Sequence, residues 1–122
     1  MQFEAVVSII DDDELVRDSI QSLLESLQYT VHTFASAEEF LTSQQLHQTS
    51  CVISDVQLPG LSGIEFEALL RTEGYHIPVI LITGYPDERV RDRAMRAGAT
   101  SFLSKPISEA DLISCLDRAL KG

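Results

Sequence analysis

The feature that most constrains this chain is a regular alternation between short β-rich runs and longer segments with helical spacing, repeated five times within 122 residues. The β-rich runs cover residues 5–10, 29–34, 51–54, 79–82 and 100–103. Each is followed by a segment whose apolar residues recur every three or four positions. This alternation predicts one α/β domain, residues 1–122, with a parallel sheet, right-handed crossovers and helices on both faces.

Capping residues, prolines and glycines indicate where the helices begin and end. An apolar stripe predicts the first helix, and its members are Leu15, Ile20, Leu23, Leu24 and Leu27, with Asp13 or Glu14 at the positive end. Ser36, with Glu39 three residues later, predicts a capping box for the second helix. The remaining helices are expected at residues 62–73, from Pro86 to Gly98, and after Ser108. Residues 44–50 are polar and are expected to form a helix end and a loop.

Charge and cysteine content narrow the possible partners. The formal net charge of −10 argues against nucleic-acid binding by this domain and suits a divalent cation or a basic partner. Cys51 and Cys115 lack the spacing of a zinc site or a disulfide framework, so they are expected to fill the core in a reducing compartment. The sequence has neither a membrane-span pattern nor a signal-peptide pattern. We therefore expect a cytoplasmic location and no membrane contact.

Chemically distinctive residues follow the ends of four predicted strands. They are Asp11 and Asp12 after the first, Asp55 after the third, Thr83 after the fourth, and Lys105 with Pro106 after the fifth. Taken singly, an aspartate there is usually a cap, a threonine before glycine a turn, and a lysine a solvated charge. Parallel strands bring their carboxyl ends to one edge of the sheet, where such folds place their sites. A shared site is the better explanation of all of them together.

The chemistry of such a site follows from its charges. Two carboxylates about 5 Å apart repel by roughly 3 kcal/mol at an effective dielectric near 20, so the three aspartates need a counter-charge. Oxygen ligands without cysteine or histidine favour a hard cation such as Mg²⁺. Asp55 could then attack phosphorus in line, while Thr83 and Lys105 stabilise the phosphoryl oxygens. The residues predict formation of an aspartyl phosphate.

The same residues resemble the receiver domains of bacterial two-component response regulators, over nearly the whole chain. The resemblance is carried by Asp11-Asp12, by Asp55-Val-Gln-Leu-Pro59 with Gly63, by Ile82-Thr83-Gly84 and by Lys105-Pro106. It implies a flavodoxin-like (βα)5 fold with strand order 2-1-3-4-5. The pattern is nearest to receivers fused to helix-turn-helix output domains.

The resemblance also implies roles for the site residues. Asp55 would accept a phosphoryl group from the phosphohistidine of a sensor histidine kinase or from a small donor. The domain would catalyse only this transfer and its own dephosphorylation, and would not otherwise be an enzyme. Asp12, Asp55 and the backbone carbonyl of Gln57 would bind Mg²⁺ or Mn²⁺, and Asp11 would act through water. The side chain of Gln57 occupies a position thought to tune dephosphorylation.

A conformational switch is implied as well. Thr83 would move toward the phosphoryl group, and Phe102, at a position more often tyrosine, would turn inward with it. The surface of the fourth helix, fifth strand and fifth helix would change and control an output, either a domain in the same chain or a separate target, with transcription as the expected process. The Lys105-Pro106 peptide bond would be cis, as is usual in the family.

The predicted fourth helix is unusually basic for this acidic chain. It carries four of the nine basic residues, which are Arg89, Arg91, Arg93 and Arg96, interleaved with acidic ones. A solvated helix with pairs of opposite charge explains this as well as a partner surface does. Our hypothesis is a homodimer through this surface, favoured by phosphorylation.

Three other functions fit part of the pattern. Phosphotransferases of the haloacid dehalogenase type also use a strand-end aspartate, but they carry a second aspartate where this chain has Gln57. A flavin mononucleotide module shares the fold, yet Asp11–Glu14 would repel its phosphate. The third alternative is a receiver-like module that binds a protein without being phosphorylated, although no site residue is missing from this sequence.

Overall fold

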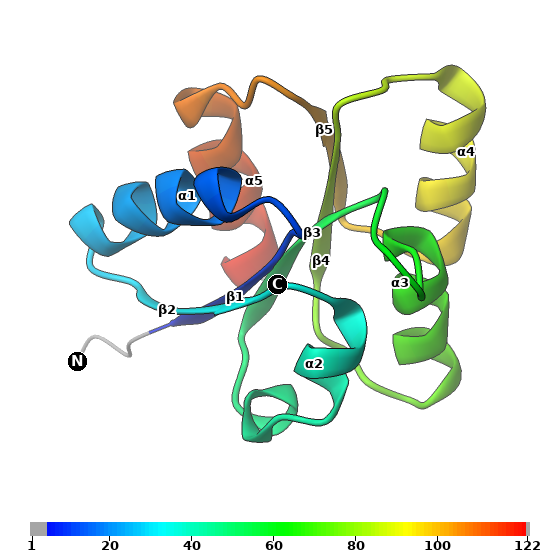
Figure 1. The fold of residues 1–122 in the computed structure, drawn as a ribbon, viewed down its shortest axis with the longest axis horizontal. Coiled ribbons are helices and arrows are strands. Elements are labelled where there is room, and N and C mark those ends of the chain that lie inside the picture. The colour runs from blue at the N-terminus through cyan, green and yellow to red at the C-terminus, as the bar shows by residue number, and fades with distance from the viewer. Residues whose placement is uncertain (1–4, 122) are drawn as a thin grey trace.

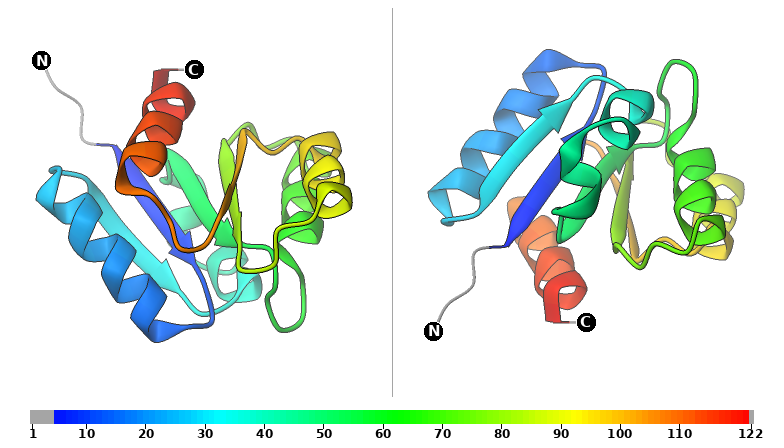
Figure 2. Two further views of the ribbon diagram at one scale, coloured as in Figure 1. Left: turned by 90° about the horizontal axis from the view of Figure 1, so that it is seen from above. Right: turned by 90° about the horizontal axis from the view of Figure 1, so that it is seen from below.

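The computed structural model describes residues 5–121, so residues 1–4 and 122, at the two ends of the expected domain, lie outside the described part. Its five strands are β1 (Val6–Ile10), β2 (Thr30–Phe34), β3 (Cys51–Asp55), β4 (Val79–Thr83) and β5 (Ser101–Ser104). They form one parallel sheet in the order β2-β1-β3-β4-β5, and Figure 2 shows them side by side. The predicted flavodoxin-like order is confirmed.

Helices cover both faces of this sheet. They are α1 (Glu14–Ser26), α2 (Ala37–Leu41), α3 (Gly63–Thr72), α4 (Glu88–Ala97) and α5 (Glu109–Lys121), with a short 3-10 helix η1 (Gln44–His47). Figure 1 shows α1 and α5 on one face and α2, α3 and α4 on the other. Among residues 5–121, none of the helices has the length and apolar character needed to cross a membrane.

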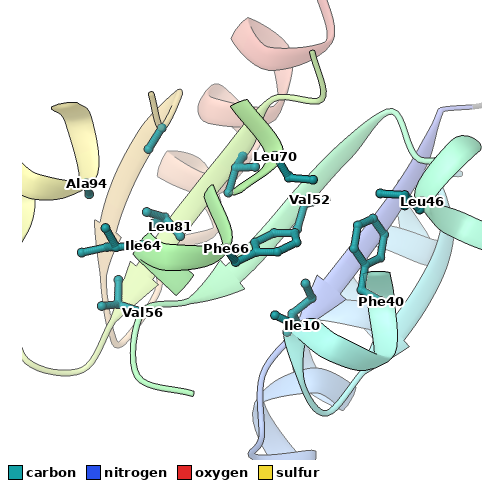
Figure 3. Close-up of a cluster of buried hydrophobic side chains, with 13 residues drawn as sticks. Ile10, Phe40, Leu46, Val52, Val56, Ile64, Phe66, Leu70, Leu81 and Ala94 are labelled. Carbon is teal, nitrogen blue, oxygen red and sulfur yellow. The ribbon is translucent and has the colours of Figure 1, made fainter. Parts of the chain in front are cut away.

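The sheet separates two hydrophobic cores. On the α2, α3 and α4 side, Phe66 packs edge-on against Phe40 with ring centroids 5.7 Å apart, near Ile10 and Leu81 (Figure 3). On the other side, α1 and α5 pack Leu24 and Leu116 against the sheet. Every residue of β3 and β4 is buried, as expected for central strands covered on both faces. The strand ends are thereby held at fixed positions.

Caps define the helix starts. Asp13 caps α1 by accepting a hydrogen bond from the backbone N–H of Leu15, which confirms its expected place. The capping box predicted at α2 is only half formed, because Ser36 accepts from the N–H of Glu39 whereas the Glu39 carboxylate accepts from Ala35 instead. The complete capping box lies at Ser62 and Glu65, at the start of α3, where the Ser-x-x-Glu pattern is present in the sequence but no capping box was predicted.

Other expectations were wrong at the edges of elements. Leu15 is 79% exposed and Leu27 is 40% exposed, because both lie at the ends of α1, beyond the reach of the sheet. Helix α4 begins at Glu88 with Asp87 as its cap, so Pro86 precedes the helix instead of forming its first turn. Residues 44–50 were expected to form a helix end and a loop, but α2 already ends at Leu41, and the stretch contains the separate short helix η1, which Leu46 anchors to the core.

Candidate functional site

Three carboxylates meet at the carboxyl edge of the sheet. Asp55 is the last residue of β3, and Asp11 and Asp12 directly follow β1, which pairs with β3 so that Ile10 lies beside Ser54. One carboxylate oxygen from each aspartate lies within 4.8 Å of the others. Asp11 and Asp55 are buried, whereas Asp12 is exposed. The cluster is open to solvent on the Asp12 side.

Lys105 supplies an ammonium group to this cluster. Its Nζ donates to Oδ2 of Asp55 at 2.9 Å and to Oδ2 of Asp11 at 3.1 Å. Burial alone would lower the pKa of Lys105, but the hydrogen bonds to Asp55 and Asp11 outweigh it and raise the pKa above its ordinary value. The lysine is therefore a permanent cation at neutral pH, and one positive charge faces three carboxylates.

Asp11 is the most enclosed of the three carboxyl groups. Burial raises the pKa of Asp11, and a hydrogen bond from the backbone N–H of Asp13 at 2.9 Å opposes that change. The backbone carbonyl of Asp11 accepts a 2.6 Å hydrogen bond from the guanidinium of Arg17, on α1. Arg17 was not predicted as a site residue, and only its position one turn into α1 could have suggested a contact with the preceding loop.

The backbone around Asp55 is tightly constrained. Its Oδ1 accepts from the N–H of Gln57 at 3.0 Å, and the residue is 5% exposed. A Cβ atom at Gly63 would lie 2.2 Å from the carbonyl oxygen of Asp55, so only glycine allows the start of α3 to pack this closely against β3. The N–H of Gly63 also donates to the carbonyl of Val56 at 2.9 Å. These contacts fix the direction in which the Asp55 carboxylate points.

Thr83, at the end of β4, is bound to the loop that follows Asp55. Its hydroxyl donates to Oε1 of Gln57 at 2.8 Å and accepts from the backbone N–H of Tyr85 at 3.0 Å. The Thr83 side chain is completely buried. The contact between the side chains of Thr83 and Gln57 was not predicted from the sequence.

Phe102 lies on β5, one strand beyond Thr83. It is partly buried against the core on the α4 side and lines a groove of about 370 Å³ together with Glu88 and Arg91. The Lys105-Pro106 bond that follows β5 is cis, as expected. Lys105 is further fixed by its backbone N–H, which donates to the carbonyl of Thr83 at 2.7 Å.

The donor set suits a hard divalent cation. Carboxylate oxygens come from two adjacent strands, and the cluster itself contains no sulfur or imidazole ligand. Such ligands favour Mg²⁺ or a similar ion, which keeps several of its waters and needs only one or two carboxylates. The exposed Asp12 leaves a solvent path for a hydrated ion. The residues present therefore fit the metal that the sequence predicted.

Comparison with known families agrees with this fold. The sequence profile of the response regulator receiver domain matches residues 7–117. The chain therefore belongs to the receiver domain family of two-component response regulators. This membership argues against the haloacid dehalogenase and flavin mononucleotide alternatives.

Individual relatives are transcriptional and signalling regulators. Nodulation protein W of Bradyrhizobium diazoefficiens is 41% identical over 113 residues, which are 93% of this chain and 50% of that protein. Transcriptional regulatory protein FixJ of Azorhizobium caulinodans is 39% identical, over 93% of this chain and 54% of its own length. The crystal structure of FixJ-N aligns with a TM-score of 0.88 at 32% identity, covering 98% of this chain and 96% of that one. The chain thus spans about half the length of the full-length relatives it matches.

Proposed function

We propose that this receiver domain is phosphorylated on Asp55. The observation that carries the proposal is the cluster itself, in which three carboxylates lie within 4.8 Å of one another and the Lys105 ammonium contacts two of them. One ammonium leaves the cluster with excess negative charge, which a divalent cation would offset. We assign Asp12, Asp55 and the backbone carbonyl of Gln57 as its ligands, with Asp11 acting through water. Bound Mg²⁺ would neutralise charge on the phosphoryl oxygens.

In the proposed transfer, a carboxylate oxygen of Asp55 forms a bond to phosphorus. The bond from phosphorus to the donor's imidazole nitrogen breaks, and its electron pair stays on the imidazole. The Lys105 ammonium, already 2.9 Å from Asp55, stabilises the negative charge of the incoming group. The Thr83 hydroxyl donates to a phosphoryl oxygen once it is in place. The same residues would support hydrolysis of the aspartyl phosphate.

The partners follow from this chemistry and from family membership. We propose a sensor histidine kinase as donor and, since relatives are about twice as long, an output domain of the helix-turn-helix type as target. Thr83 and Phe102 would transmit the signal to the surface of α4, β5 and α5. The exposed arginines of α4 support a homodimer on phosphorylation. The domain as a whole would span residues 1–122 and act in the cytoplasm.

Small phosphodonors provide the test. Incubation with acetyl phosphate and magnesium should add one phosphoryl group, measured by intact-protein mass spectrometry, and EDTA should prevent the addition. Asp55→Asn should take up none, whereas Ser54→Ala, at the preceding position of β3, should be phosphorylated normally. A wild-type chain that takes up no phosphoryl group would favour the alternative of a receiver-like module that binds proteins without phosphorylation.

A further inference from the structure

The Thr83 hydroxyl has one proton, and it donates that proton in a hydrogen bond to Gln57. The hydroxyl donates to Oε1 of Gln57 at 2.8 Å, while its oxygen accepts from the N–H of Tyr85 at 3.0 Å. A threonine hydroxyl has a single hydrogen to donate. In this arrangement Thr83 cannot donate to any other acceptor until the bond to Gln57 breaks.

Gln57 is connected to the site at both of its ends. Its backbone N–H donates to the Asp55 carboxylate at 3.0 Å, and its side chain binds Thr83. The residue thus joins the proposed phosphoacceptor to the hydroxyl that would contact the phosphoryl group. This geometry makes Gln57 the direct competitor of a phosphoryl oxygen for the same proton.

The Gln57 side chain lies beside an open groove that can accommodate it when it is displaced from Thr83. Thr83 is fully buried, but Gln57 is exposed and lines a groove of about 480 Å³ between the β3–α3 loop and α4. Ser62 and Arg93 contribute polar groups to that groove. A released Gln57 amide can be solvated there, and the buried Thr83 hydroxyl would then donate to the phosphoryl oxygen, so neither group would be left without a hydrogen-bond partner.

We propose that Gln57 is a positioning residue that holds Thr83 in its resting rotamer and competes with the phosphoryl group for the Thr83 proton. The inference rests on the proposed phosphorylation of Asp55 and deepens it. Release of Gln57 becomes part of the response to phosphorylation. The strength of this hydrogen bond then sets how readily Thr83 responds.

A double-mutant cycle measures this competition. Gln57→Met keeps the length of the side chain and removes the acceptor. Binding of beryllofluoride with Mg²⁺, a stable mimic of the phosphoryl group, should tighten about two- to tenfold in this variant, the range for one neutral hydrogen bond. The change should disappear in a Thr83→Ala background. Gln44→Met, at an exposed glutamine in η1, is the matched control and should bind as the wild type does.

A second readout needs neither metal nor mimic. Three-bond couplings to the Thr83 methyl carbon should report one rotamer in the metal-free wild type and averaging in Gln57→Met. Each of three results would overturn the inference. The first is unchanged or weaker mimic binding in Gln57→Met, and the second is a Gln57→Met effect of the same size in the Thr83→Ala background. The third is averaging of the Thr83 rotamers already in the metal-free wild type. A wild type that binds no mimic at all would overturn the proposed function together with it, so the two failures are distinguishable.

Discussion

The Lys105 ammonium lies 2.9 Å from Oδ2 of Asp55, although 50 positions separate the two residues in the chain. They belong to the ends of β5 and β3, and β4 lies between these strands. The lysine side chain crosses the end of β4 beside Gly84, where a Cβ atom would lie 3.8 Å from the lysine Cδ. An ion pair therefore links two strands that do not pair with each other.

Replacing Lys105 should separate metal binding from phosphorylation. Lys105→Met removes the positive charge that offsets Asp11 and Asp55, so magnesium affinity, measured by titration calorimetry, should stay equal or rise. Phosphorylation by acetyl phosphate should slow about a hundredfold, because a group that stabilises the transition state is gone. Lys121→Met, at an exposed site near the end of α5, serves as control. Loss of magnesium binding in Lys105→Met would contradict this division of roles.

Replacing Asp12 should abolish magnesium binding at millimolar concentrations. Its carboxylate is the exposed member of the cluster and is the one that a hydrated ion meets first. Asp13→Asn is the matched control, because it removes a neighbouring charge while asparagine still caps α1. If Asp12→Ala binds magnesium as the control does, Asp12 is not a ligand.

The two glycines that follow α3 and α4 should differ in their tolerance of alanine. Gly74 and Gly98 have φ of 87° and 109°, so alanine at either should cost about 1–2 kcal/mol of unfolding free energy. At Gly98 the new Cβ would also lie 2.8 Å from Oε2 of Glu67, whereas at Gly74 it meets nothing within 4 Å. We expect Gly98→Ala to lose about 1 kcal/mol more in urea denaturation. Equal losses would show that the Glu67 side chain moves aside freely.

Arg71 should be needed to keep a buried charge on α3. Glu67 is fully buried, its Oε2 lies 2.6 Å from Nε of Arg71, and the guanidinium also donates to the carbonyls of Tyr75 and Ile77. Arg71→Met should cost about 2–3 kcal/mol at pH 7.5, at the low end for a broken buried pair because the Arg71 side chain is 30% exposed. Arg91→Met, on the exposed side of α4, should cost far less.

The cost of Arg71→Met should also depend on pH. Burial raises the pKa of Glu67 above its ordinary value even though Arg71 opposes the change, and losing Arg71 raises it further. Because the folded-state pKa is the higher one, protonation favours the folded state, and the penalty grows as pH rises from the unfolded value through the folded one. Urea titrations should therefore give a smaller difference from wild type at pH 5 than at pH 7.5. A difference that does not change with pH would mean that Glu67 does not titrate in this window.

The sequence was sufficient to predict the strands and helices and the edge of the sheet at which the site lies. Buried β-branched runs give parallel strands, and the ends of parallel strands converge, so Asp11, Asp55 and Lys105 could be grouped before their distances were known. It could not indicate that Thr83 binds the side chain of Gln57, since that contact depends on the rotamers of two residues from different strands and loops.

The ends of helices were predicted least well, and for a related reason. Helical periodicity put Leu15 on the apolar stripe of α1, but the sheet does not extend far enough to cover it. Periodicity would equally place a glutamate such as Glu67 on the solvent side, whereas its partner Arg71 lies one turn later and allows it to be buried. The exposure of Leu15 depends on how far the sheet extends, and the burial of Glu67 depends on its ion pair with Arg71, and apolar periodicity reports neither.

Locating the phosphoryl group in the chain tests the central claim most directly. After phosphorylation by acetyl phosphate and magnesium, borohydride reduces an aspartyl phosphate to homoserine, and peptide mass spectrometry then reads the residue at each position. We expect homoserine at position 55, with Asp11, Asp12 and the exposed Asp13 unchanged. Homoserine at another position, or a phosphorylated chain in which Asp55 survives reduction, would contradict the account.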